Sequence, residues 1–160
     1  MKPRASTMNG GRLVLGPLAA LIASGLCAGR AHARLGEDAS SVAAEQLRWQ
    51  AKVQVVQKPG HAVHDMQLPA GASIRQFVSD AGKVFAVSWS GGWRPDLRDL
   101  MGPHYDRYVA AARQQRRGRG PLRVELPGLV VVMGGHQRAF FGHAYLTDLV
   151  PPAFRTEDLR

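Results

Sequence analysis

Turn-forming residues divide most of this chain into short runs, and their spacing limits the fold more than any other feature of the sequence. Proline presets φ and glycine takes positive φ, so the breaks that contain them are predicted to be turns. The runs between the breaks are short and rich in β-branched and aromatic residues, which favours strands. The predicted strands are 61–68, 73–79, 83–90, 122–126, 129–133 and 136–146, with a run at 53–56 as the candidate start of another.

The middle of the chain carries a helical repeat instead of an alternating one. Over 97–112 apolar residues recur at spacings of three and four, which places them on one face of a helix. Asp96 is predicted to cap a short first turn. Because Gly102-Pro103 interrupts the pattern, the main helix is predicted from Pro103 to about Arg117.

The order of the predicted elements defines a fold class. A flexible lead-in over 35–41 is expected to precede a shorter helix over 42–51, with Ser41 as its cap. Strand-rich segments lie before and after the main helix. We therefore predict an α+β fold in which an antiparallel sheet of about six strands packs on one main helix. The bulky, alternating residues of 83–90 are expected to share the core face: Phe85, Val87 and Trp89.

The first 33 residues are predicted to be a secretory signal peptide rather than part of the fold. A basic start precedes an uncharged apolar stretch of 16 residues, shorter than the roughly 20 that a spanning helix needs. Ala31-His32-Ala33 then places small residues around a cleavage site, which we predict after Ala33. Lipidation at Cys27 is an alternative, but Leu26 stands where a small residue is needed. Loss of this segment would leave a chain without cysteine, which suits an oxidising compartment.

The mature chain, residues 34–160, is predicted to be a single domain that ends in a polar tail. The segment before it carries four basic residues, so 17 basic and 12 acidic residues remain and the formal charge falls from +9 to +5. This charge favours anionic surfaces but does not indicate nucleic-acid binding. No second long apolar stretch follows. We therefore expect a periplasmic or secreted protein without a transmembrane segment after cleavage.

Three blocks of the chain read IRQFVSDAGKVFAVSWSG, PDLRDLMGPHYDRYVAAA and GGHQRAFFGHAYLTDLVP. Taken in this order, they resemble the domain-of-unknown-function family numbered 2844, which consists of small exported bacterial proteins. The resemblance covers about residues 34–160 and rests on the joint order of the blocks, since no single block is a catalytic signature. It implies export and a single domain. It implies no activity, cofactor or catalytic residue.

The histidines are spaced in a way that argues against a shared metal site. His136 and His143 are seven apart in the predicted strand 136–146, so we expect them on opposite faces and about 20 Å apart. His61, His64 and Asp65 would converge only on a helix, whereas turns on both sides predict a strand. We therefore expect packing or hydrogen-bonding roles for the histidines and predict no metal or other cofactor.

Serine chemistry is a further candidate, because two serines lie near the end of a predicted strand. The candidates are Ser88 or Ser90 as nucleophile, His104 or His136 as base, and Asp96 or Asp99 as the orienting carboxylate. The glycine that precedes the serine by two in a nucleophile elbow is absent, and Asp96 already has a capping role. A small hydrolase or metal-dependent enzyme that uses His104 or His136 is therefore an alternative and not the leading hypothesis.

The densest local charge is the run RQQRRGRGPLR. Its arginines suit phosphate or carboxylate groups, although cations near a helix C-terminus also interact favourably with the helix dipole. No aromatic residue lies among them for base stacking, so nucleic acid is not expected. A loop tryptophan is a second candidate contact. The predicted binding residues are Arg113, Arg116, Arg117, Arg119, Arg123 and Trp93.

The leading hypothesis is a non-enzymatic module that binds another envelope or secreted component. An anionic-surface binder that uses the segment Arg113–Arg123 is an alternative beside the small enzyme. A histidine, a carboxylate and Ser88 or Ser90 that meet in a cleft would favour the enzyme. A closed core with Trp93 and the arginines exposed on one face would favour binding.

Overall fold

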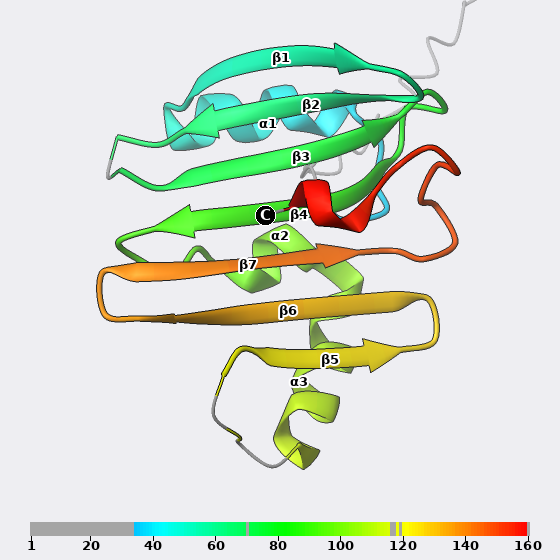
Figure 1. Cartoon of the computed structure of the whole chain (residues 1–160). Helices are drawn as coiled ribbons and strands as arrows, with labels where there is room; N and C mark the ends of the chain where they lie inside the picture. Colours follow the sequence, from blue (N-terminus) through cyan, green and yellow to red (C-terminus); the bar gives the residue numbers. More distant parts are fainter. Residues whose placement is uncertain (1–33, 70, 116–117, 119, 160) are drawn as a thin grey trace, which may run out of the picture.

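The computed structural model describes residues 34–69, 71–115, 118 and 120–159, and a seven-stranded antiparallel sheet forms its centre (Figure 1). The strand order is β1-β2-β3-β4-β7-β6-β5, so β4 and β7 are neighbours in the sheet although they are far apart in sequence. The antiparallel sheet is confirmed, with seven strands in place of about six. The strands are β1 (Lys52–Lys58), β2 (His61–Gln67), β3 (Ser73–Ser79), β4 (Val84–Gly91), β5 (Leu122–Leu126), β6 (Leu129–His136) and β7 (Ala139–Tyr145).

Helices cover one face of the sheet, which we call the helical face (Figure 1). They are α1 (Ser40–Trp49), α2 (Leu97–Met101), the short 3-10 turn η1 (Gly102–His104) and α3 (Tyr105–Gln114). Apolar side chains from the sheet and from all three α-helices form one large core cluster here, with Leu100, Met101 and Val131 fully buried. The prediction of packing on a single main helix is therefore only partly correct, because α1 and α2 also cover this face.

The starts of the helices correct two predictions and confirm one. Ser41 lies inside α1 and does not cap it, because no side chain caps this helix. The chain enters α1 directly from a contact with the sheet, where the Ala39 N–H donates to the Gly82 carbonyl at 2.8 Å. Asp96 caps α2 as predicted, since its side chain accepts from the backbone N–H of Arg98 at 2.8 Å. Pro103 belongs to η1, so α3 begins two residues after it.

The segment before α1 and the end of α3 also differ from expectation. The lead-in packs against the domain rather than lying loose: Leu35 is fully buried, and its N–H donates to the Leu100 carbonyl at 3.0 Å. At the other end α3 stops at Gln114, because Gln115 adopts an extended conformation. The helix is therefore shorter than the predicted span to Arg117, a residue outside the described part of the chain.

The opposite face of the sheet, which we call the C-terminal face, is covered in part by the end of the chain (Figure 1). The Phe154 ring lies 4.9 Å from the Phe85 ring and 5.1 Å from the His61 ring, in edge-to-face contacts that favour aromatic packing. The 3-10 turn η2 (Thr156–Leu159) follows, and Leu159 is 1% exposed. The C-terminal segment thus supplies apolar side chains to a second core.

Strand β4 is buried on both faces because it lies between these two cores. The prediction that Phe85 shares a face with Val87 and Trp89 is wrong. Val87 and Trp89 face the helices, whereas Phe85 belongs to the cluster under Phe154. A bulge causes the change: Phe77 pairs with Ala86 and its neighbour Val78 pairs with Val84, so Phe85 is an extra residue and the alternation restarts after it.

The hairpin of β6 and β7 turns three residues later than predicted. Gly134-Gly135 lies within β6, and the turn falls at Gln137-Arg138, where Arg138 has φ 69. The two histidines are consequently on different strands. His136 pairs with Ala139, and His143 lies four residues further along β7, so both point to the same face. The prediction of opposite faces is wrong because it assumed one continuous strand.

Candidate functional site

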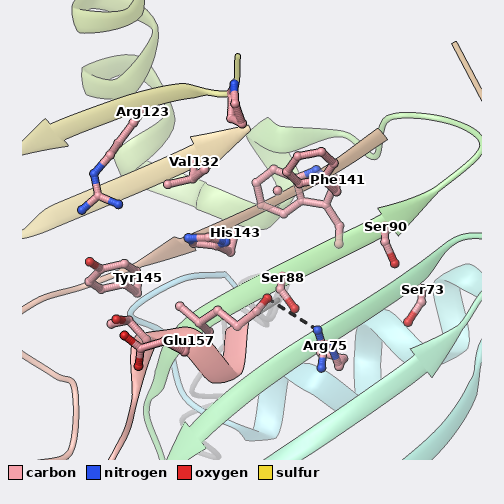
Figure 2. Close-up of a pocket in the computed structure, with 15 residues that line it drawn as sticks. Ser73, Arg75, Ser88, Ser90, Arg123, Val132, Phe141, His143, Tyr145 and Glu157 are labelled. Atoms are coloured by element: carbon pink, nitrogen blue, oxygen red, sulfur yellow. Dashed lines mark hydrogen bonds between the residues drawn. The ribbon is translucent and has the colours of Figure 1, made fainter. Parts of the chain in front are cut away.

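The part of the C-terminal face that the C-terminal segment leaves uncovered is a groove of about 770 Å3. This volume lies within the range of small-molecule sites. We call it the open groove. Five strands and η2 contribute to its walls, and Figure 2 shows the side chains that point into it. The lining residues are Ser73, Arg75, Ser88, Trp89, Ser90, Pro121, Arg123, Val132, Phe141, Gly142, His143, Tyr145, Thr156, Glu157 and Leu159.

Strand register brings the polar residues of the groove into one row. Directly opposite residues on neighbouring antiparallel strands point to the same face, with Cβ atoms about 4.5–5.5 Å apart. The row runs across β3, β4, β7, β6 and β5 and consists of Arg75, Ser88, His143, Val132 and Arg123. Figure 2 shows Ser88 between His143 and Arg75. The pairing of β4 with β7 therefore creates this arrangement.

Ser88 forms a buried polar point on the floor of the groove. The residue is 3% exposed, and its Oγ has no hydrogen-bond partner among the residues that the structure describes. A buried hydroxyl that makes no hydrogen bond costs about 1–3 kcal/mol, and such groups are rare in folded proteins. An unsatisfied hydroxyl at the base of an open cavity is the arrangement expected where a ligand or water supplies the partner.

Both arginines of the groove have acidic neighbours. Arg123 pairs with Glu125 on the same strand, and this hydrogen bond raises the pKa of the Arg123 guanidinium. Arg75 lies directly across from Asp65 of β2, and its Nη2 is 3.5 Å from the Leu159 carbonyl oxygen (Figure 2). Glu157 of η2 adds a carboxylate to the lining itself. The groove and its immediate neighbours therefore hold two guanidinium groups and three carboxylates, those of Asp65, Glu125 and Glu157.

One end of the groove is polar and made by side chains of neighbouring strands. The Gln67 amide donates to Asp65 Oδ1 at 2.7 Å and to Ser73 Oγ at 3.1 Å. Ser73 Oγ also lies 3.4 Å from Asp65 Oδ1. These bonds hold Ser73 in place at the groove, opposite Ser90 on β4.

An aromatic side chain is exposed at the groove, and a glycine accounts for its position. Phe141 is 44% exposed and lies opposite Gly134, where an added Cβ would come within 2.7 Å of the ring. Gly134 thus leaves room for the Phe141 ring to lie over β6. On the other face Gly142 does the same for Trp89, whose ring would collide with a Cβ there. Gly134 and Gly142 therefore accommodate aromatic rings, whereas Gly135 has a positive φ of 106 and approaches the backbone of Ala139.

A ring contact lies in the middle of the groove. The rings of His143 and Tyr145 are stacked, with centroids 6.4 Å apart. Phe141, His143 and Tyr145 alternate along β7 and all line the groove. The other predicted strand with histidines is confirmed as β2, where His61 is buried and burial lowers the pKa of His64.

The predicted binding residues do not gather at one place in the described structure. Arg123 lines the groove on the C-terminal face, whereas Arg113 is exposed in the last turn of α3, on the helical face. Trp93 is 37% exposed in the loop after β4 and is not part of the lining. The remaining three, Arg116, Arg117 and Arg119, lie outside the described residues.

The predicted catalytic candidates come together only in part. Ser88 and Ser90 line the groove, but His104 and His136 do not. His104 lies in η1, where burial and then Arg107 lower its pKa, and His136 is exposed at the end of β6. Asp96 caps α2, and Asp99 forms an ion pair with Arg48 at 2.8 Å. These two carboxylates have local structural roles.

The histidine and the carboxylate that line the groove together with the serines are His143 and Glu157, and sequence reasoning missed both as site residues. It also missed Arg75. The signal for His143 was present as a polar residue between Phe141 and Tyr145 in a strand. Its partner Ser88 is 55 residues away in sequence, however, and only the pairing of β4 with β7 places the two opposite each other.

The chain was compared with known proteins and families. The family model of Protein of unknown function (DUF2844) matches residues 31–159. No curated protein and no solved structure matches the chain. Within the described residues no three side chains of histidine, cysteine, aspartate or glutamate gather as metal ligands. None of the helices in that same part of the chain has the length and apolar character needed to cross a membrane.

Proposed function

The chain belongs to the DUF2844 family, and we propose that it is a non-enzymatic binding domain whose ligand occupies the open groove. The observation that carries this proposal is the Ser88 hydroxyl, which is buried on the floor of the groove without a described partner. A site for a small ligand is typically concave and largely apolar, with a few well-placed polar groups. The open groove has this composition, with Phe141 and Val132 beside its serines and arginines.

We propose that this binding takes place outside the cytoplasm, in the periplasm or after secretion. The support is the sequence of residues 1–33, which lie outside the described structure. Its basic start, its apolar stretch and its alanines before position 34 are the parts of a signal peptide. The ligand or partner would then be a component of the envelope or of the surrounding medium.

A hydrolase is the second candidate function, because a serine, a histidine and a carboxylate line one groove. Ser88 lies directly opposite His143, and Glu157 comes from η2. Acyl transfer also needs hydrogen-bond donors aimed at the developing oxyanion. Ser88 lies in the middle of a strand paired on both sides, so the nearby backbone N–H groups belong to the sheet ladders. This favours binding over catalysis at the same residues.

Binding through the segment Arg113–Arg123 to an anionic surface has less support. Of the two described arginines of that set, Arg123 lines the groove on the C-terminal face, whereas Arg113 belongs to α3 on the other side of the sheet. A flat anionic surface would contact one of them at a time. Replacement of Arg116, Arg117 and Arg119 by alanine tests this reading, since a surface binder should lose affinity, and its binding should also weaken steeply with added salt.

A fragment screen by NMR tests the proposed function without assuming a ligand class. The exported chain would be purified after secretion and labelled with 15N, and its spectrum recorded with small neutral, acidic and basic fragments. We expect shifts that cluster at Ser88, Phe141 and His143. Ser88→Ala should weaken those shifts, while Trp93→Ala, a loop variant outside the groove, should leave them unchanged. Shifts scattered over the surface would contradict a groove site.

An esterase assay on the same purified protein distinguishes binding from hydrolysis. Turnover of p-nitrophenyl acetate above the rate of an equal concentration of free histidine, lost in both Ser88→Ala and His143→Gln, would establish the hydrolase and overturn the binding domain. We expect no such turnover. Mass measurement of the secreted chain also tests the cleavage predicted after Ala33.

A further inference from the structure

We infer that the ligand of the open groove is a neutral polyhydroxylated molecule, a short saccharide. The inference rests on the proposed function, because it names the ligand class of that same site. Three independent features support it: the balance of charge around the groove, the presence of both hydrogen-bond donors and acceptors in its lining, and an exposed aromatic ring at the same site.

The charge balance argues against a simple anion. Arg123 forms its ion pair with Glu125, and Arg75 faces Asp65 across the strand pair. Glu157 places a further carboxylate in the lining. An incoming carboxylate or phosphate would have to compete with Glu125 for Arg123, and the carboxylates of Asp65 and Glu157 on the same face would repel it. A neutral ligand avoids this cost while still using the same polar atoms.

The pattern of donors and acceptors suits hydroxyl groups. A hydroxyl donates one hydrogen bond and accepts two, so a polyol matches a surface where both kinds of group occur together. The groove offers arginine donors on β3 and β5, a carboxylate acceptor on η2, and hydroxyls of Ser73, Ser88 and Ser90 between them. A sugar hydroxyl over Ser88 would satisfy its buried Oγ, which is otherwise without a described partner.

The exposed ring gives an apolar counterpart to these polar groups. Sugar rings have one face of C–H groups, which pack on the electron-rich face of an aromatic ring. Phe141 is 44% exposed at the groove, and Gly134 beneath it leaves space for the ring to lie over the sheet. The same row that holds Ser90 thus holds Phe141, so one ligand can contact a hydroxyl and the ring together.

The groove volume sets the size of the ligand. A volume of about 770 Å3 accepts a drug-sized molecule, which for a saccharide means a disaccharide or a trisaccharide. Ligands of this size contact several strands at once, from Ser73 on β3 to Arg123 on β5. A single hexose would fill only part of the site.

The test is titration of the secreted full domain with three neutral trisaccharides: cellotriose, maltotriose and chitotriose. We expect at least one to bind, with NMR shifts at Ser88, Phe141 and His143 and a Kd in the micromolar to millimolar range. Phe141→Ala and Ser88→Ala should each weaken binding about tenfold or more. Val56→Ala is the matched control, since Val56 is 42% exposed on the C-terminal face but lies outside the groove.

Salt dependence and charged probes complete the design. Binding of the trisaccharide should change less than about twofold when salt is raised from low to high concentration, because no net charge is neutralised. Tighter binding of benzoate or phenyl phosphate in the groove, weakened by salt, would overturn the saccharide. So would the absence of shifts with all three trisaccharides. If fragments still bind in the groove, only the ligand class fails; if they do not, the proposed function fails as well.

Discussion

The two faces of the sheet differ in how completely other elements cover them. On the helical face three helices close over an apolar cluster that reaches across the sheet. On the C-terminal face the described C-terminal segment covers one aromatic cluster, and the rest of that face carries serines, arginines and a histidine. The covered regions bury apolar side chains, which stabilises the fold. The open groove instead retains polar groups that a core would exclude.

The largest loss of stability is expected from a substitution in the C-terminal segment, where this segment covers part of the C-terminal face. Phe154→Ala would remove the ring that contacts Phe85, Phe77 and His61. Loss of a buried phenylalanine costs about 3–5 kcal/mol, so the free energy of unfolding in urea should fall by roughly that amount. Trp93→Ala, at a half-exposed loop residue, should change it by less than about 1 kcal/mol. Equal changes in the two variants would show that the C-terminal segment does not stabilise the fold.

A smaller loss is expected on the helical face when the space under a ring is filled. Gly142→Ala would place a Cβ against the Trp89 indole and should destabilise the domain by about 1–3 kcal/mol. Gly92→Ala is the control, because its nearest atom is 3.8 Å away and its φ is not positive. Thermal unfolding of both variants measures the difference, and a Gly142→Ala protein as stable as Gly92→Ala would refute the close approach.

A substitution in the open groove should leave the free energy of unfolding unchanged or raise it, rather than lower it. Ser88→Ala removes a buried hydroxyl without a described partner, so the unfolding free energy should rise by about 1 kcal/mol or stay constant while ligand binding is lost. Ser79→Ala should lower it, since the Ser79 hydroxyl is 3.3 Å from the Lys83 carbonyl and from its N–H. A Ser88→Ala protein that is clearly less stable would mean that this hydroxyl is structural.

The smallest effect concerns two histidines on the helical side. Burial lowers the pKa of His64, and burial followed by Arg107 lowers the pKa of His104. The unfolded chain therefore binds more protons than the folded one, so stability is complete above about pH 6.5 and decreases as the pH falls through the lowered values. In urea titrations at pH 7.5 and 5.5, His64→Gln and His104→Gln should each reduce this loss. An unchanged pH profile in the double variant would contradict the assignment.

Local patterns predicted most elements of this fold. Turn residues separate the strands because proline and glycine set φ in each break, and Asp96 caps α2 because its side chain reaches the free N–H groups nearby. The same reasoning failed at Gly134-Gly135, which suggested a turn. There Gly134 makes room for the Phe141 ring. This requirement comes from the partner strand and not from the local backbone conformation.

The helical repeat, the strand runs and the antiparallel class follow from the order of residues along the chain, because side-chain periodicity and φ preferences act over a few neighbours. Which face of each strand is covered does not follow from that order. Arg75, Ser88 and His143 become neighbours through strand register, and the groove is the part of their face that the described C-terminal segment does not cover. Contacts between residues so far apart in sequence depend on how the sheet is assembled, and the candidate site is made of such contacts.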